Sequence, residues 1–126
     1  MSVLVDSSVW IDYFRGADNS SGLDILIDEN LVTTNDVILA ELVPFLKLKR
    51  QHKVIQLLCE VTRLPLNIDW LQIIEFQLKC LKSGANGVGI SDLIIAQNAL
   101  QNNCTVYSLD KHLRLLNQVI DTGLHD

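Results

Sequence analysis

With 126 residues, the chain is long enough for one domain with its own hydrophobic core. Its formal net charge of −5 excludes a protein that binds nucleic acid through overall positive charge, but it permits an enzyme whose carboxylates hold metal ions. Apolar residues make up 48% and the mean hydropathy is +0.25, yet no apolar run reaches the roughly 18 residues of a membrane span. We therefore expect residues 1–126 to form a single domain outside the membrane.

The cysteines and the first residues indicate a cellular compartment. Cys59, Cys80 and Cys104 are far apart, odd in number and have apolar neighbours, so we predict three buried free thiols. Free thiols are typical of a reducing compartment. The first residues also lack the basic segment and cleavage site of a signal peptide. These features together predict a cytoplasmic protein.

The first stretch of the chain combines a strand with a carboxylate. Residues 3–5 are apolar and mostly β-branched, which predicts a short strand that is buried on both faces. Asp6 follows directly, and functional sites of open α/β sheets lie at the carboxyl ends of their strands. The alternative is that Asp6 only caps a helix over residues 9–14, a role that Ser7 or Ser8 is equally able to fill.

Two further strands are indicated in the first half of the chain. Residues 23–30 have helical spacing of their apolar residues, and residues 31–34 follow as a short strand. Residues 61–66 are a candidate third strand, in which Pro65 indicates a position at an edge of the sheet.

A helix that follows Asn35 carries the next candidate acid. Asn35 is a good helix cap, and Glu41 lies at the margin of the apolar stripe of this helix. A functional acid and a surface glutamate at the edge of that stripe remain equally open on spacing alone. Pro44 predicts a break, with a new helix over residues 44–58.

The predicted helix over residues 44–58 concentrates basic charge. Its basic side chains are Lys47, Lys49, Arg50, His52 and Lys53. They are either a contact for RNA or an acidic partner, or a solvated helix face, and we favour the solvated face.

A long amphipathic helix begins the second half of the chain. Residues 70–81 have helical spacing, and the predicted buried stripe consists of Leu71, Ile74, Leu78 and Leu81.

Two more acids follow the glycine-rich loop over residues 83–89, which lacks the sequence of a phosphate-binding loop. Ser91 is a candidate cap for the next helix, and Asp92 shares a face of that helix with small apolar residues. Asp92 therefore points toward the edge of the sheet, unless it only complements the helix dipole. Residues 104–109 predict a strand that ends at Asp110, and residues 119–120 are a candidate last strand.

The alternation of strands and helices predicts an α/β sandwich with parallel strands. Parallel strands place their carboxyl ends at one edge, so Asp6, Glu41, Asp92 and Asp110 are expected to lie near one another. Close carboxylates repel, and a hard divalent cation relieves that repulsion. Mg²⁺ prefers oxygen ligands and retains several waters, and such an ion activates water for attack on a phosphodiester.

Four stretches that contain these acids resemble one known family. Val3–Phe14, Thr33–Leu42, Ser91–Ala96 and Tyr107–His112 occur in the same order in PIN-domain ribonucleases, notably the VapC-type toxins of toxin–antitoxin pairs. The stretches span nearly the whole chain. The resemblance implies a PIN-like α/β sandwich with a central parallel sheet of about four or five strands flanked by helices.

The resemblance also implies an activity and partners. It implies a metal-dependent endoribonuclease that uses Mg²⁺ or Mn²⁺, with RNA as substrate, a cognate antitoxin as partner and a homodimer as the assembly. The acids that carry over as catalytic and metal-binding residues are Asp6, Glu41, Asp92 and Asp110. Ser7 and Ser108 are predicted to support them, whereas the chain departs from the family at Ser8, where many members have asparagine.

Two other classes of metal-binding α/β protein require residues that this chain lacks. A receiver domain needs an acidic pair after the first strand, but Asp6 is followed by two serines, and it needs an acceptor aspartate where this chain has residues 64–66, Leu-Pro-Leu. A haloacid-dehalogenase-type phosphatase requires aspartate at the position of Ser8. A non-catalytic PIN-like binding module remains open.

Overall fold

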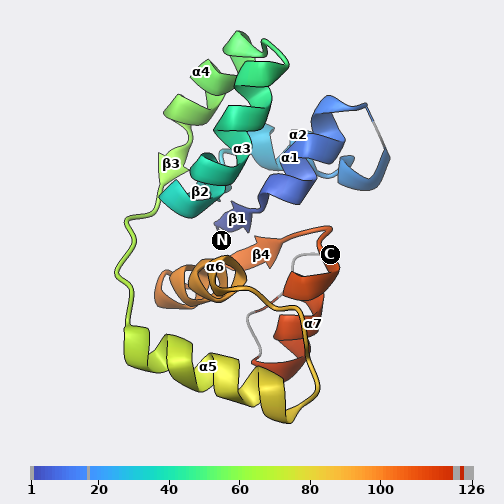
Figure 1. Cartoon of the computed structure of the whole chain (residues 1–126). Coiled ribbons are helices and arrows are strands. Elements are labelled where there is room, and N and C mark those ends of the chain that lie inside the picture. The colour runs from blue at the N-terminus through green and yellow to red at the C-terminus, as the bar shows by residue number, and fades with distance from the viewer. Residues whose placement is uncertain (1, 17, 121–122, 124–126) are drawn as a thin grey trace.

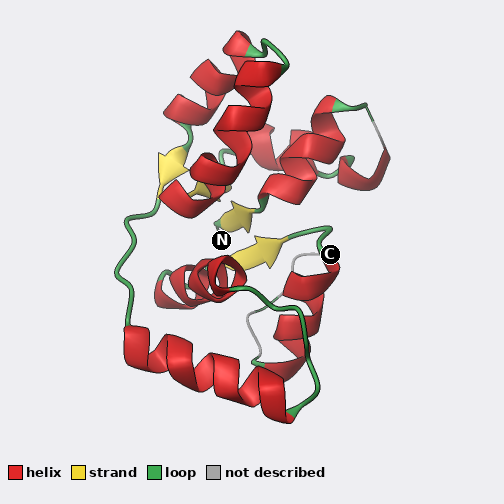
Figure 2. Cartoon of the chain, viewed as in Figure 1, coloured by secondary structure: helices red, strands yellow, loops and turns green. Residues whose placement is uncertain are grey.

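The computed structural model describes residues 2–16, 18–120 and 123. Short strands alternate with helices along the whole of this part of the chain (Figures 1 and 2). The strands are β1 (Val3–Val5), β2 (Val32–Thr34), β3 (Thr62–Arg63) and β4 (Thr105–Tyr107). The helices are α1 (Ser7–Phe14), η1 (Asp18–Ser20, a 3₁₀ turn), α2 (Leu23–Asp28), α3 (Asp36–Leu48), α4 (His52–Glu60), α5 (Trp70–Lys82), α6 (Ile90–Gln101) and α7 (Lys111–Val119).

The strands form one parallel sheet in the order β3-β2-β1-β4. Val3 pairs with Val32 of β2 on one side and with Thr105 of β4 on the other, so β1 is a central strand. β3 is an edge strand, as Pro65 predicted, although it is shorter than the expected segment. The predicted α/β sandwich with a central parallel sheet is therefore confirmed. A central strand needs apolar residues on both faces, which explains the continuous apolar run of β1.

The side chains of β1 alternate between two hydrophobic clusters. Val3 and Val5 pack in the cluster built from α1 to α4, whereas Leu4 packs on the opposite face with residues of α5, α6 and α7. All three are at most 3% exposed. The helices thus cover both faces of a narrow sheet, and Figure 1 shows α3 and α5 on opposite sides of it.

Two buried asparagines join the layers beside the sheet. The side chain of Asn35 caps α3 by accepting a hydrogen bond from the N–H of Ile38 at 2.9 Å. Its Nδ2 donates to Oδ1 of Asn98 on α6 at 2.9 Å, and Nδ2 of Asn98 donates to the carbonyl of Pro65 at 3.1 Å. Because buried amides are costly when unpaired, this network fixes how α3 and α6 sit relative to each other.

The predicted break at Pro44 is wrong. Pro44 lies inside α3, which continues to Leu48, and the turn to α4 lies at Lys49–Gln51, where Arg50 has a left-handed φ of 55°. The helix tolerates the missing N–H of proline because α3 packs on α1, α4 and α6. The basic residues assigned to one helix therefore lie at the tip of a hairpin between α3 and α4 (Figure 1).

The predicted buried stripe of α5 is also wrong. Leu71, Ile74, Leu78 and Leu81 are 75%, 64%, 49% and 59% exposed. The core is instead contacted by a second stripe, which consists of Ile73, Phe76 and Cys80. Both stripes have helical spacing, so spacing alone does not decide which one is buried.

Smaller differences concern caps, cysteines and the last strand. Gly89 rather than Ser91 caps α6. Cys80 and Cys104 are buried free thiols, but Cys59 is exposed on α4, against the expectation. The predicted strand at residues 119–120 is not seen, since Val119 ends α7. In the described part of the chain, none of the helices is both long and apolar enough to cross a membrane.

Candidate acidic site

Asp6 is fixed directly after the central strand. Its backbone N–H donates to the carbonyl of Tyr107 at 2.9 Å, which continues the pairing of β1 with β4. The side chain is only 4% exposed, and its Oδ2 accepts hydrogen bonds from the hydroxyls of Ser8 at 2.7 Å and Ser108 at 3.0 Å. Asp6 also caps α1, with a long bond of 3.4 Å from the N–H of Ser8. The capping role expected as an alternative therefore coexists with a buried, well-bonded carboxylate.

Two serines connect the loop after β1 with the loop after β4. The Ser8 hydroxyl accepts from the N–H of Leu109 at 3.0 Å, and the Ser108 hydroxyl accepts from the N–H of Asp110 at 3.0 Å. Each hydroxyl thus passes a hydrogen bond from a backbone N–H to the carboxylate of Asp6. Of the two predicted supporting residues, Ser108 donates to Asp6, whereas Ser7 is half-buried and joins none of these bonds. Ser8, which was not predicted as a supporting residue, donates to Asp6 instead. Its position could have indicated this contact, because the second residue after a helix cap faces the side chain of the cap.

Asp92 and Asp110 are each held at the start of a helix. Oδ2 of Asp92 accepts from the N–H of Gly89 at 3.0 Å, which closes the first turn of α6. Asp110 caps α7, and its Oδ1 accepts from the N–H of His112 at 2.7 Å. Helix N-termini interact favourably with carboxylates, so the starts of α6 and α7 fix the positions of these two side chains.

Electrostatics connects the four predicted acids to one another. Partial burial raises the pKa of Glu41 above its ordinary value of 4.5, and the charges of Asp6, Asp92 and Asp110 raise it further. Partial burial likewise raises the pKa of Asp92, with further upward contributions from Asp110 and Asp6, against the lowering effect of the Gly89 hydrogen bond. Carboxylates perturb one another in this way only when they are near. The four acids are therefore near enough to affect one another electrostatically.

His112, which is not one of the predicted site residues, lies beside this group. The charge of His112 lowers the pKa of Asp92. Its ring also packs against Gly87, where a Cβ would come within 2.8 Å of Cε1. Gly87 has a φ of 89°, so both space and backbone conformation require glycine there. The glycine-rich loop thus makes room for the imidazole of His112 near Asp92.

The donor set suits a hard divalent cation. The hydrogen bonds to Asp6 all go to Oδ2, that to Asp92 goes to Oδ2, and that to Asp110 goes to Oδ1. Each of these carboxylates keeps one oxygen free of hydrogen bonds from the described residues, and Glu41 keeps both. Among the described residues, no group of three or more histidine, cysteine, aspartate or glutamate side chains is close enough to hold a metal ion. Mg²⁺ fits this arrangement because it binds through one or two carboxylates and retains several waters.

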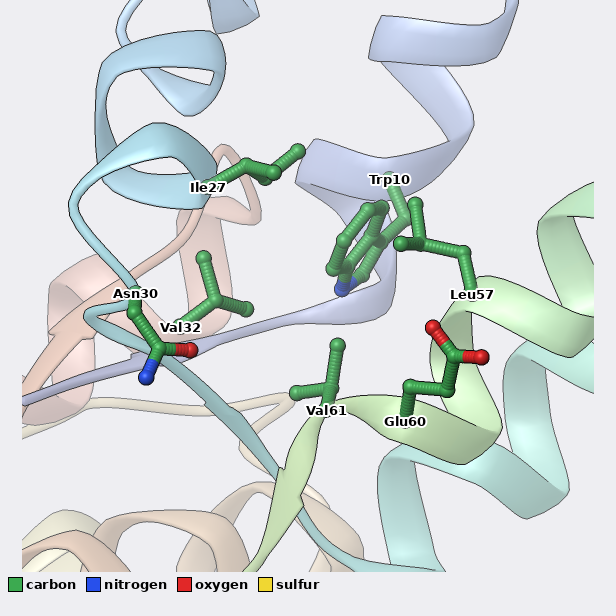
Figure 3. A pocket seen from close by; sticks show the side chains of 7 residues that line it. All are labelled: Trp10, Ile27, Asn30, Val32, Leu57, Glu60 and Val61. Atoms are coloured by element: carbon green, nitrogen blue, oxygen red, sulfur yellow. The ribbon is translucent and has the colours of Figure 1, made fainter.

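A separate cavity of about 170 Å³ lies between α1, α2 and α4. Figure 3 shows its side chains around the indole of Trp10, which is fully buried and whose Nε1 has no hydrogen-bond partner among the described residues. The lining contains Glu60 as its one carboxylate and none of the four acids. This cavity therefore lacks the chemistry of the acidic site.

Removing the Ser8 hydroxyl tests its connecting role. The change Ser8→Ala leaves the N–H of Leu109 without its acceptor and Asp6 without its shortest donor, so we expect unfolding free energy to fall by about 1–3 kcal/mol. The matched control is Ser7→Ala, which breaks no such bond and is expected to be nearly neutral. Chemical denaturation of both variants measures the difference, and equal stabilities contradict the role of Ser8.

Charge repulsion at the site predicts a pH-dependent stability. Because the pKa of Glu41 is raised in the folded state, its ionised form destabilises the fold as the pH rises above the ordinary value of 4.5. In EDTA at pH 7.5, Glu41→Gln should raise the Tm, and the gain should shrink as the pH is lowered toward 4. Excess Mg²⁺ should then stabilise the wild type more than the variant. Glu75→Gln, an exposed site on α5, is the control and should show none of these effects.

The sequence matches a known protein family. A family model described as the PIN domain matches residues 3–118. A comparison with curated protein sequences found no significant match.

Solved structures share the fold at low sequence identity. VapBC2 from Rickettsia felis, solved bound to a DNA fragment from its promoter, is 18% identical, with 99% of this chain and 98% of that chain covered and a TM-score of 0.77. FitAcB from Neisseria gonorrhoeae is 21% identical, with 98% and 96% covered and a TM-score of 0.75. The family match covers nearly the whole chain and includes all four acids, and the chain therefore belongs to the PIN-domain family.

Proposed function

We propose that the protein is a metal-dependent endoribonuclease, the VapC-type toxin of a toxin–antitoxin pair, which hydrolyses RNA phosphodiester bonds with Mg²⁺ or Mn²⁺. The observation that carries the proposal is the group of four acids, each with at least one carboxylate oxygen free of hydrogen bonds from described residues. PIN domains are typically nucleases, and the sequence resemblance to VapC-type toxins supports RNA as the substrate.

The four acids have different parts in this proposal. Asp6, Glu41 and Asp92 hold the ion directly or through water, and Asp110 completes the site. Once bound, a divalent ion supplies Lewis-acid stabilisation of the charge that develops on the phosphate. The buried position of Asp6 keeps its free oxygen in one orientation, whereas Glu41 on the more exposed side of α3 is placed to adjust to the substrate.

The resemblance to VapC-type toxins and the shared fold indicate a protein partner. We propose a cognate antitoxin as the protein partner, because the chain resembles VapC-type toxins and shares the fold of VapBC2 and FitAcB. We place the protein in the cytoplasm, where the three free cysteines remain reduced.

An exposed apolar face, formed by α5 and the start of α6, supports a homodimer. Six large apolar side chains there are between 48% and 75% exposed, namely Trp70, Leu71, Ile74, Leu78, Leu81 and Ile90. Most of them line a hollow of about 410 Å³ between α5 and the start of α6. A contiguous apolar patch is typical of an interface, and a second copy offers a self-complementary one.

Cleavage of a mixed RNA pool tests the proposed activity. We expect cleavage with Mg²⁺ or Mn²⁺, none in EDTA, and a loss of about 10- to 100-fold or more in Asp92→Asn, since even outer partners of a metal site have effects of that size. The control is Asp36→Asn, on the exposed start of α3, where Asp36 pairs with Arg63 at 3.3 Å. Folded wild type that cleaves no RNA under any of these conditions contradicts the nuclease and favours a non-catalytic binding module.

Sedimentation measures the proposed dimer. Ile74→Lys places a charge in the centre of the α5 face and should convert a dimer to a monomer without loss of helical content. Ile25→Lys is the matched control, because Ile25 is 60% exposed on α2, away from this face. A wild type that sediments as a monomer at high concentration contradicts the homodimer.

A further inference from the structure

A hollow between the end of α1 and the α3–α4 hairpin has the composition of a nucleotide site. Its volume is about 270 Å³, and none of the four acids lines it. The lining consists of Phe14, Arg15, Phe45, Leu46, Lys49 and Gln51. Aromatic rings beside cations are the combination with which proteins bind single-stranded nucleic acid, since rings stack on bases and cations contact phosphates.

The hairpin next to this hollow is the most basic part of the chain. Of the ten lysines and arginines in the whole chain, four lie within seven residues of this hairpin, namely Lys47, Lys49, Arg50 and Lys53. All four are exposed, and none forms an ion pair with a carboxylate in the part of the chain that the structure describes. In a chain of net charge −5, this concentration of unpaired cations is complementary to a phosphate backbone.

The hollow and the acidic site both contain residues of α3, with the hollow nearer to the C-terminal end of the helix. Glu41, Phe45 and Lys49 are spaced by four residues each, so Phe45 and Lys49 follow Glu41 along the helix by a rise of about 6 Å and 12 Å. A rise of 12 Å corresponds to about three to four stacked nucleotides at 3.4 Å each. A strand whose phosphate lies at the acids therefore reaches the hollow within a few nucleotides.

We propose that this hollow binds one nucleotide of a single-stranded RNA substrate, a few nucleotides from the cleaved bond, an inference that rests on the proposed function. The base packs on Phe45 and on the side of Phe14 not covered by Trp10, with which Phe14 stacks at 5.8 Å. Lys49 and Arg15 contact the adjoining phosphates. The side chain of Gln51 has no hydrogen bond to any described residue and is available to the edge of the base.

Equilibrium binding tests the subsite apart from cleavage. Fluorescence anisotropy of a labelled single-stranded RNA is measured with the full chain in EDTA over a range of salt, and a gel verifies that the strand is intact. Lys49→Ala should lower the magnitude of the slope of log affinity against log salt by about 0.7, the value of one phosphate contact to a single strand. The matched control is Lys79→Ala, which removes an exposed cation from α5.

The aromatic contact has its own variants. Phe45→Ala should weaken binding by about fivefold or more, the effect of losing one stacked base. Phe45→Tyr keeps the ring and should bind like the wild type, whereas Phe45→Leu keeps apolar packing and should bind as weakly as the alanine variant. Thermal unfolding of each variant verifies the fold.

The outcomes separate the two proposals. Wild type that binds no single-stranded RNA at any salt concentration overturns the proposed ribonuclease together with this subsite. Wild type that binds, with Lys49→Ala and Phe45→Leu both indistinguishable from Lys79→Ala, overturns the subsite alone. Equal loss of affinity of Phe45→Leu for a duplex and for a single strand overturns the stacking contact.

Discussion

Repulsion between carboxylates is the constraint around which this fold is arranged. Partial burial raises the pKa values of Glu41 and Asp92, and the charges of the neighbouring acids raise them further. Backbone and hydroxyl donors, each directed at one oxygen, hold Asp6, Asp92 and Asp110 at the starts of α1, α6 and α7. A fold that builds negative charge into one edge gives up stability without a cation, which is the expected cost of a site prepared for an ion.

The parallel sheet makes this crowding possible. Asp6 follows the central strand β1, Asp110 lies a few residues after its neighbour β4, and the helices that carry Glu41 and Asp92 are locked together by the pair Asn35 and Asn98. The acids come from four segments of the chain, yet each is placed by the end of a regular element or by a buried hydrogen bond. Strands of two or three residues are sufficient, because helices pack on both faces of the sheet.

Much of this arrangement could be predicted from the sequence, for physical reasons. A short apolar run followed by aspartate indicates a buried parallel strand and its end, which gave the sheet and the positions of Asp6 and Asp110. Prediction from the sequence was wrong where two arrangements of the same segment fit the local pattern equally well. Helix α5 has two apolar stripes, and only packing against the core selects that of Ile73. The role of Ser8 depends on Leu109, which lies 101 residues away, and no local pattern reveals such a contact.

The bond between Ser108 and Asp6 joins residues that are 102 positions apart. During synthesis, β1 and the first hundred residues are made before β4 is available to pair with β1 and before Asp110 is present. The acidic site is therefore incomplete in every nascent chain and forms only when the last strand inserts beside the first. For the ribonuclease that we propose, this order delays activity until β4 has been made, and we expect a chain that ends before β4 to be inert.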